Sequence, residues 1–508
     1  MFKRMDCMLP KPRADLKPNT ADFERVPLVK PTGFREYDAR WLFPDEINLM
    51  GLNAVGLGMA TLFARRGVPK RIVVGHDYRW YSGAVKQALM TGLLAGGCEV
   101  HDIGLALSPM AYFAQFDLDV EGVAMVTASH NDNGWTGIKM GLSRPLTFGP
   151  DDMLELKKIV LDGSYDVKTG GRYIFVLDMA ERYIKSLIDR PKLKRRLKVV
   201  AACGNGTAGV FAPQVLSAVG CEVVPLNVDL DHSFPNHNPN PEDMKMLNAV
   251  SAKVLETGAD VGLAFDGDGD RCGVVANDGH EIFADKVGVM LARDISSIYK
   301  GAKFVVDVKS TGLFTTDPVL IANGATTTYW KTGHSYIKRF NFENKTLVGF
   351  EKSGHFFFNT PLGRGYDDGL VAALAVCDML DRNPAKSVAD LRDALPKTWS
   401  SPTMSPHCDD EKKYDVVERI TEHYKRQKDT GGRIAGQSIR DLITVNGVRV
   451  MLEDGTWGLV RASSNKPELV VVVESPTSEA NMKAIFKDID QQLARFPEVG
   501  EYNQKIAV

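Results

Sequence analysis

The chain has 508 residues, of which 44% are hydrophobic and 25% are charged, with 62 Lys and Arg against 64 Asp and Glu. A single hydrophobic core stops growing near ~250–300 residues, so this length predicts about three or four domains. The average composition excludes a disordered or disulfide-stapled chain, and the net charge of −2 gives no reason to expect nucleic acid as a partner.

The seven cysteines are scattered along the chain without a CxxC pair. An odd number at such spacing favours reduced thiols and a cytoplasmic location. No apolar run reaches the ~18–20 residues that a membrane helix needs, so we predict no membrane partner. The first thirty residues lack the apolar segment of a signal peptide and are predicted to form a disordered or extended arm. The sequence leaves the oligomeric state open.

Short apolar runs alternate with helical periodicity over the first three quarters of the chain. Strands are predicted at residues 71–77, 98–104 and 123–127, with helices between them at 85–94 and 109–116. This alternation is typical of a mostly parallel sheet. It restarts near residue 197 and again near residue 303, which predicts three related α/β units.

The last quarter of the chain has a different pattern. Strands rich in Val and Leu are predicted at 445–452, 457–462 and 469–474, and an amphipathic helix is predicted at 481–493. A small α+β domain is the natural interpretation. The predicted parts are therefore an arm at residues 1–30, α/β domains at 31–172, 173–282 and 283–394, and an α+β domain at 395–508.

The first unusual loop follows the strand predicted at 123–127 and contains Ser129 and His130, with Lys139 ten residues on. Its short polar residues are also typical of a structural turn, so that alternative stays open. The functional alternative is a serine nucleophile or phosphate carrier with basic groups nearby. A Ser–His–Asp triad is disfavoured, because adjacent Ser and His usually do not face each other and no G-x-S-x-G elbow surrounds Ser129.

The second loop, Asp-Gly-Asp-Gly-Asp-Arg, follows an apolar run that ends at residue 265. On charge alone an acidic turn stays open, because two carboxylates in water repel by under ~1 kcal/mol. The alternating glycines, however, let three oxygens converge on one hard cation. An EF-hand is excluded, since Arg271 stands where that motif needs Gly and Asn277 where it needs Glu. The pattern favours a magnesium site formed by Asp266, Asp268 and Asp270.

The third loop follows the strand predicted near residue 350. It offers Glu351, Ser353 and His355 as donors and acceptors over five residues. Such a group suits a ligand with neighbouring hydroxyls, although ordinary turn chemistry at a strand end remains the alternative.

The fourth loop lies between two strands of the last domain. It combines one planar cation with several short polar side chains, namely Arg461, Ser463, Ser464 and Asn465. Arg binds phosphate with two parallel hydrogen bonds and small side chains add donors, so this composition suits an anion. A surface hairpin with an incidental Arg stays open as the alternative.

Together the four loops supply a hydroxyl nucleophile, a metal site, a hydroxyl-binding site and an anion site, which are the parts of phosphoryl transfer to and from a sugar. In their order and spacing, from about Phe34 onward, they resemble the signature loops of the α-D-phosphohexomutase superfamily, with the closest likeness to the bacterial phosphomannomutase/phosphoglucomutase group. The stretches Tyr37-Asp-Ala-Arg40 and Gly-His-Asp-Tyr-Arg79 are similar as well. The resemblance implies an α/β protein in which three related α/β domains with mixed sheets and a C-terminal α+β domain surround a central cleft.

The resemblance also implies roles for individual residues. The catalytic residues implied are Ser129, which would carry the phosphoryl group, and His130, Lys139, Arg40 and Arg271. The Mg²⁺ ligands implied are Asp266, Asp268, Asp270 and an oxygen of phosphorylated Ser129. The substrate-binding residues implied are Tyr37, Lys309, Thr332, Gly333, His334, Glu351, Ser353, His355, Arg461, Ser463, Ser464 and Asn465.

By this likeness the substrate is a hexose phosphate, of mannose or glucose or both, and its 1- and 6-phosphates interconvert through a hexose 1,6-bisphosphate. Glucose 1,6-bisphosphate would act as the activator, and a mobile fourth domain would admit and release the sugar. The alternatives within the class are a phosphoglucosamine mutase and a single-substrate phosphoglucomutase. A sugar-phosphate-binding protein without catalysis and a metal-dependent phosphatase remain as alternatives from other classes.

Overall fold

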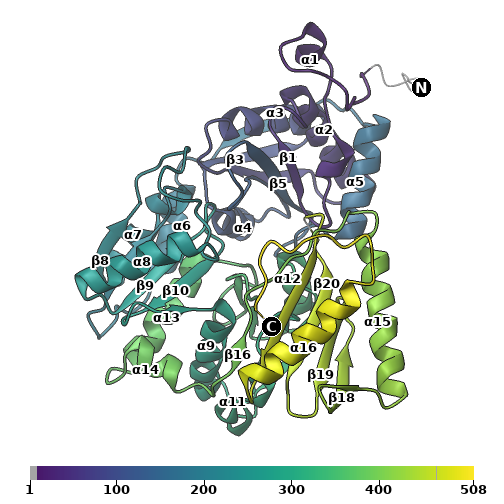
Figure 1. Ribbon diagram of the computed structural model, residues 1–508. Coiled ribbons are helices and arrows are strands. Elements are labelled where there is room, and N and C mark those ends of the chain that lie inside the picture. The colour runs from purple at the N-terminus through teal and green to yellow at the C-terminus, as the bar shows by residue number, and fades with distance from the viewer. Residues whose placement is uncertain (1–8, 465, 508) are drawn as a thin grey trace. The chain divides into compact units, whose positions relative to one another are not determined.

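The computed structural model describes residues 9–464 and 466–507. In this structure the chain forms two compact units (Figure 1). The first contains the residues up to 282 together with 353–388, and the second contains 283–352 together with the residues from 389 onward.

The N-terminal arm is more structured than the sequence predicted, although its residues 1–8 lie outside the described part. Within residues 9–30 the chain forms a short helix, α1 (Ala21–Arg25). The buried side-chain amide of Asn48 donates hydrogen bonds to the carbonyl oxygens of Phe23 and Val26. Local patterns miss this order, because the residue that holds the arm lies more than twenty positions further along the chain.

The first sheet of the first unit has six strands. They are β1 (Ala39–Leu42), β2 (Arg71–His76), β3 (Glu99–Leu105), β4 (Gly122–Val126), β5 (Trp135–Gly141) and β6 (Arg172–Phe175). Their order in the sheet is β1-β5-β4-β2-β3-β6. Strands β2, β3, β4 and β6 are parallel, whereas β5 and β1 are antiparallel to their neighbours, so the sheet is mixed. Every residue of β4 is buried, which accounts for its unbroken apolar sequence.

The helices that accompany this sheet are α2 (Leu49–Arg65), α3 (Ser82–Ala95), α4 (Ser108–Asp117), α5 (Pro150–Asp162) and α6 (Met179–Ile188), with the 3₁₀ turn η1 (Pro31–Gly33) before β1. Helices α2 and α3 approach each other closely at a glycine. A Cβ atom added to Gly56 would lie 2.2 Å from the carbonyl oxygen of Leu89, so only a residue without a side chain fits there.

The second sheet of the first unit is also mixed. Its strands are β7 (Lys198–Ala202), β8 (Glu222–Leu226), β9 (Val261–Phe265), β10 (Cys272–Ala276) and β11 (Glu281–Ile282), in the order β11-β10-β9-β7-β8. The accompanying elements are η2 (Thr207–Val210), α7 (Ala212–Ala218) and α8 (Met244–Thr257). Strands β9 and β10 form an antiparallel pair, and the predicted metal loop is the connection between them.

Residues 353–388 return to the first unit with strand β15 (Phe356–Phe358) and helix α13 (Gly369–Arg382). Helix α13 packs on α7 and β10. At its N-terminus, Asp368 accepts a hydrogen bond of 2.9 Å from the hydroxyl of Tyr183. Helix α14 (Val388–Asp393) follows.

The second unit begins with three parallel strands. They are β12 (Lys303–Asp307), β13 (Thr326–Trp330) and β14 (Val348–Phe350), and β12 lies between the other two. The helices of this part are α9 (Ala284–Ile298), α10 (Leu313–Thr316), α11 (Pro318–Ala322) and α12 (His334–Asn344).

The C-terminal sheet is antiparallel, with the order β16-β21-β20-β19-β18-β17. The strands are β16 (Trp399–Ser400), β17 (Arg433–Ile434), β18 (Gln437–Ile443), β19 (Val448–Leu452), β20 (Trp457–Ala462) and β21 (Leu469–Ser475). Helices α15 (Lys413–Asp429) and α16 (Glu479–Leu493) pack against it. The predicted strands and the amphipathic helix of the last quarter are therefore confirmed.

A buried arginine joins the two sheets of the second unit. The guanidinium of Arg449, on β19, lies 4.2 Å from the ring centroid of Tyr329 and 3.6 Å from that of Trp457. It also donates hydrogen bonds to the carbonyl oxygens of Val308 and Ser310. The α/β and α+β parts of this unit thus share a packed core.

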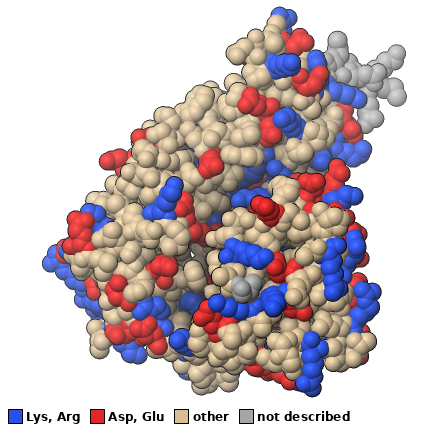
Figure 2. All heavy atoms as spheres, in the orientation of Figure 1, with Lys and Arg blue, Asp and Glu red and all other residues tan. Residues whose placement is uncertain are grey.

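On the face drawn in Figure 2, acidic and basic side chains are interspersed. Among the described residues, no helix is long and apolar enough to cross a membrane.

Candidate active site

Ser129 lies three residues beyond the end of β4 and has an unusual backbone conformation. Its φ is +52°, in the left-handed region that a residue with a side chain rarely adopts. The N–H of Ser129 donates to the hydroxyl of Thr127 over 2.8 Å, and its carbonyl oxygen accepts from Arg79 over 3.0 Å. These bonds hold the strained serine in place at the end of a buried strand.

Arg79 is a site residue whose role the sequence did not predict. Besides Ser129, its guanidinium donates to the carbonyl oxygens of Asn131 and Asp132, so one buried side chain binds three positions of the serine loop. Asp77 orients Arg79 through an ion pair of 3.3 Å. The sequence signal that could have revealed this role is the pair of opposite charges, Asp77 and Arg79, directly after β2.

The hydroxyl of Ser129 faces two possible proton acceptors. Its Oγ lies 2.9 Å from Oδ2 of Asp266 and 3.1 Å from Nδ1 of His130. The expectation that adjacent Ser and His do not face each other is therefore wrong here, because the left-handed turn at Ser129 brings the two side chains to one side.

The acidic loop between β9 and β10 lies beside this serine. Asp266, Asp268 and Asp270 are completely buried, and one oxygen from each lies within 4.8 Å of the others. A Cβ atom on Gly267 would lie 2.5 Å from the carbonyl oxygen of Ser129, so the glycine lets the two loops approach. The geometry suits one hard cation with oxygen ligands.

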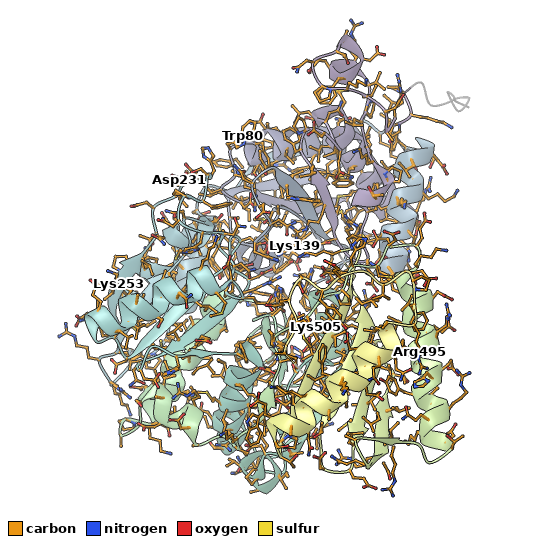
Figure 3. The ribbon with its side chains drawn as sticks, viewed as in Figure 1. Trp80, Lys139, Asp231, Lys253, Arg495 and Lys505 are labelled. Carbon is orange, nitrogen blue, oxygen red and sulfur yellow. The ribbon has the colours of Figure 1, made fainter. Side chains whose placement is uncertain are left out.

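Lys139, on β5 and labelled in Figure 3, neutralises part of this cluster. Its Nζ donates to Asp268 over 2.7 Å, to Asp270, and to the hydroxyl of Ser108 over 3.2 Å. Burial alone would lower the pKa of Lys139, but the two carboxylates outweigh burial and raise it well above its usual value. Lys139 is therefore an ammonium ion in this arrangement. Ser108, on α4, was not predicted as a site residue.

The pKa values of two of these aspartates shift in opposite directions. Burial, followed by the neighbouring charges of Asp270 and Asp268, raises the pKa of Asp266 well above its usual value. Burial acts in the same direction on Asp268, but the ammonium of Lys139 outweighs it and lowers the pKa of Asp268. The carboxylate nearest the serine is thus the one whose charge is least compensated by side chains.

Arg40 lies near the same cluster. Asp38 pairs with its guanidinium at 3.0 Å, and Arg40 also donates to the carbonyl oxygen of Thr127. Burial opposes its charge, but Asp38 and Asp268 outweigh burial and raise the pKa of Arg40. Tyr37 is buried just before β1, on the same stretch of chain.

Arg271 and His355 complete the group in the first unit. Arg271 Nε donates to His355 Nε2 over 2.9 Å and lies 3.8 Å from Oδ2 of Asp266. Ser353 belongs to the same unit and is half-buried.

In the second unit, Asp307 at the end of β12 organises the predicted sugar-binding residues, a role that the sequence did not reveal. Its carboxylate accepts from the hydroxyl of Thr332 over 3.1 Å and lies 3.8 Å from Nζ of Lys309.

Glu351, which follows β14, accepts a hydrogen bond of 2.6 Å from the N–H of Gly333. His334, the next residue, is buried at the start of α12.

The predicted phosphate loop lies at the end of β20, where Arg461 and Ser463 are largely buried and Ser464 is half-buried. Asn465 lies outside the described residues.

Asn446, which was not predicted, accepts hydrogen bonds from the N–H of Thr332 and from Nη1 of Arg461, at 3.3 Å and 3.5 Å. It connects the predicted sugar-binding and phosphate-binding loops within the second unit.

The site residues therefore fall into two groups. The first unit brings together Ser129, His130, Lys139, Arg40, Arg271, His355 and the three aspartates. The second unit contains Lys309, Thr332, Gly333, His334, Glu351, Arg461, Ser463 and Ser464.

Four family models match the chain in consecutive order. They are the phosphoglucomutase/phosphomannomutase alpha/beta/alpha domains I, II and III, at residues 31–166, 181–279 and 283–399, and the C-terminal domain of the same family, at residues 407–492. These matches confirm the predicted superfamily and the four-domain α/β architecture with mixed sheets.

Individual relatives agree with the family models. The chain is 35% identical to the phosphomannomutase/phosphoglucomutase of Pseudomonas syringae pv. tomato, over 92% of this chain and 98% of the relative. It is 32% identical to a phosphoglucomutase of Neisseria gonorrhoeae, over 88% and 94% of the two chains. A crystal structure of a phosphoglucomutase/phosphomannomutase family protein from Burkholderia thailandensis superimposes with a TM-score of 0.82 at 31% identity and covers 93% of this chain and 99% of its own. The chain therefore belongs to the phosphoglucomutase/phosphomannomutase family.

Proposed function

We propose that this chain interconverts hexose 1-phosphate and hexose 6-phosphate, with mannose and glucose as sugars, through a phosphoserine at Ser129 and a hexose 1,6-bisphosphate intermediate. The main support is the hydrogen bond between Ser129 and Asp266 within a buried cluster of three aspartates. A hydroxyl and a cation site that share one carboxylate suit phosphoryl transfer, because the group that moves is anionic.

Asp266, Asp268 and Asp270 would hold Mg²⁺ together with a phosphoserine oxygen. The donor set fits, since three carboxylate oxygens within 4.8 Å of one another match a small hard cation. The raised pKa of Asp266 indicates that the side chains around it do not fully neutralise its charge, so a cation bound beside the serine would be stabilised there. The bound ion would neutralise charge on the moving phosphoryl group.

Lys139, Arg40 and Arg271 would stabilise the same charge from the protein side. A general base needs a pKa near the working pH, whereas the pKa of Lys139 is raised well above its usual value by two carboxylates. This supports charge stabilisation as the role of Lys139. His130 would exchange a proton with the serine Oγ, and the distance of 3.1 Å from that oxygen to its Nδ1 supports this role.

The remaining predicted residues would bind the sugar and its second phosphate. We assign the sugar hydroxyls to Glu351 and Ser353. Nε2 of His355 accepts from Arg271, so His355 would support that cation and not contact a sugar hydroxyl. Arg461 and Ser463 would bind the phosphate that is not reacting, since an arginine fork and a hydroxyl match a phosphate group. The bisphosphate must turn over between the two transfers, so that each phosphate meets Ser129 once.

The test is intact-mass analysis before and after exposure to glucose 1,6-bisphosphate, the proposed activator. We expect a gain of one phosphate in the native protein and none in Ser129→Ala. Isomerisation of mannose 1-phosphate, glucose 1-phosphate and glucosamine 1-phosphate then defines the sugar. Net release of inorganic phosphate would indicate a phosphatase, and binding without isomerisation would indicate a non-catalytic protein.

We also propose a cytoplasmic location, supported by the scattered cysteine pattern. All six described cysteines are buried thiols outside any disulfide.

A further inference from the structure

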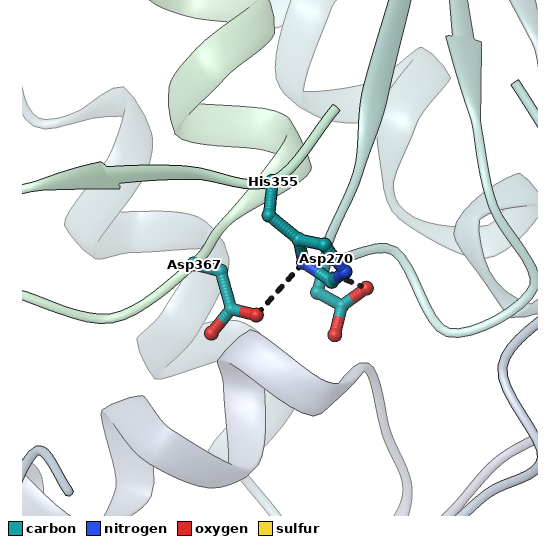
Figure 4. A group of neighbouring side chains, drawn as sticks. All are labelled: Asp270, His355 and Asp367. Carbon is teal, nitrogen blue, oxygen red and sulfur yellow. Dashed lines mark ion pairs between the residues drawn. The ribbon is translucent and has the colours of Figure 1, made fainter. Parts of the chain in front are cut away.

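One buried carboxylate near the catalytic group has no assigned role. Asp367 lies just before α13 and is completely buried. Its Oδ2 is 2.9 Å from Nδ1 of His355, and Oδ1 of Asp270 is 3.7 Å from the same nitrogen (Figure 4). The imidazole thus presents Nδ1 to two acids.

The other side of the ring determines where the proton of His355 lies. Arg271 Nε donates a hydrogen bond of 2.9 Å to His355 Nε2. An arginine N–H can only donate, so Nε2 must be the unprotonated nitrogen of the ring. The proton of the imidazole is therefore on Nδ1, which lies 2.9 Å from Oδ2 of Asp367 in an ion-pair contact that does not have the geometry of a hydrogen bond.

These bonds continue to the serine. The backbone N–H of Arg271 donates to Oδ1 of Asp266 over 3.2 Å, and Asp266 accepts from the hydroxyl of Ser129. Arg271 is also held by Glu242, at 3.4 Å from Nη1. A change in the orientation or the tautomer of the His355 ring would therefore shift the guanidinium of Arg271, which lies beside Asp266.

We propose that Asp367 is a positioning residue for the proposed phosphoryl transfer. Its negative charge, 2.9 Å from Nδ1, favours the Nδ1–H tautomer and one orientation of the His355 ring, so that Nε2 accepts from Arg271 and holds that cation beside Asp266. This inference rests on the proposed function of the same site. Carboxylates that orient a histidine through its second nitrogen have this effect in other active sites.

The same three groups, Asp270, His355 and Asp367, are spaced closely enough to hold a cation. A cation on Nδ1 would require that nitrogen to be unprotonated while Nε2 still accepts from Arg271. The ring would then be an imidazolate, which needs the loss of a second proton. The hydrogen bond from Arg271 thus favours positioning over a second metal site.

The first measurement uses the intact protein labelled with [¹⁵N]histidine. Long-range ¹H–¹⁵N spectra report which ring nitrogen carries the proton, and the spectrum of His355→Gln identifies the signal. We expect Nδ1–H in the native protein and a mixture with Nε2–H in Asp367→Ala. A native ring protonated on Nε2 would overturn the proposal, even if Asp367→Ala fails to fold.

The second measurement is a double-mutant cycle on hexose phosphate isomerisation. We expect Asp367→Ala to lower kcat at least ~10-fold with little change in KM. In the His355→Gln background the same substitution should change kcat less than ~2-fold, because Asp367 acts only through His355. Independent, additive losses would show a general structural role and would overturn the proposal.

The neighbouring Asp368 provides a matched control. It is also buried, but it accepts from Tyr183 and caps α13 instead of contacting the histidine. Asp368→Asn should leave the tautomer of His355 unchanged. If the chain proves to have no mutase activity, the proposed function fails while the tautomer measurement still decides whether Asp367 positions the ring.

Discussion

Lys139 has two partners that a metal ion would also need. Its ammonium group donates to Asp268 and Asp270, both of which belong to the proposed magnesium site. Three buried carboxylates cannot stay charged together without such compensation. The lysine therefore acts as an internal counter-ion of the acidic loop.

Lys139→Met is expected to destabilise the metal-free protein by ~3–5 kcal/mol, because it leaves buried carboxylates uncompensated. Added Mg²⁺ should restore part of this loss. The measurement is thermal unfolding in EDTA and in excess Mg²⁺, and Tm of the variant should rise more with Mg²⁺ than that of the native protein.

The control for this substitution is Lys158→Met. Lys158 pairs with Asp162 on the surface, where an ion pair contributes little. It should leave both unfolding curves nearly unchanged. A Lys139→Met protein that is indifferent to Mg²⁺ would contradict the counter-ion role.

At the scale of an element, α13 begins with a carboxyl group that responds to pH. Burial raises the pKa of Asp368 to about 7, although hydrogen bonds from the N–H of Val371, the hydroxyl of Tyr183 and the N–H of Leu370 act against it. In the unfolded chain an aspartate titrates near ~3.9. Between these two values the folded protein binds the extra proton, so this group's contribution to stability falls as the pH rises from ~4 to about 7.

Asp368→Asn removes this titration and keeps a residue that caps helices well. Relative to the native protein, we expect the variant to gain at least ~1 kcal/mol of unfolding free energy between pH 5 and pH 8. Urea unfolding of both proteins at the two pH values measures the difference. A difference that does not change with pH would contradict the raised pKa.

The sequence predicted elements well where a local pattern determines them. The run at residues 123–127 became β4, and the Val-rich runs of the last quarter became β19, β20 and β21. The arm was predicted less well, because Asn48 organises it from a distant position. The boundaries at residues 172, 282 and 394 remain predictions.

The candidate site shows the same division. Ser129 and the acidic loop stand out in the sequence because a hydroxyl and three carboxylates follow apolar strands. Asn446 and Asp367 do not stand out, because each acts on residues far away in the chain. No local pattern reports such a contact.

For the whole molecule, the predicted mobile fourth domain has to be weighed against the core of the second unit. Arg449 and the network around Glu474 join the α+β part to the α/β part. Glu474, on β21, accepts from Lys286 on α9 and from the N–H of Gly312, and these contacts, with others nearby, lower its pKa despite burial. Any motion of the predicted phosphate loop therefore has to carry these α/β elements with it or break the buried ion pair between Lys286 and Glu474.

The return of residues 353–388 to the first unit has a consequence for biosynthesis. A ribosome releases the chain from its N-terminus, at ~5–20 residues per second. The first unit cannot complete its folding until residue 388 has left the ribosome. For several seconds, therefore, the surfaces of β10 and α7 that α13 covers in the folded protein stay uncovered. During that interval the nascent chain exposes surface that is buried in the folded protein, so this is when it would depend most on chaperones.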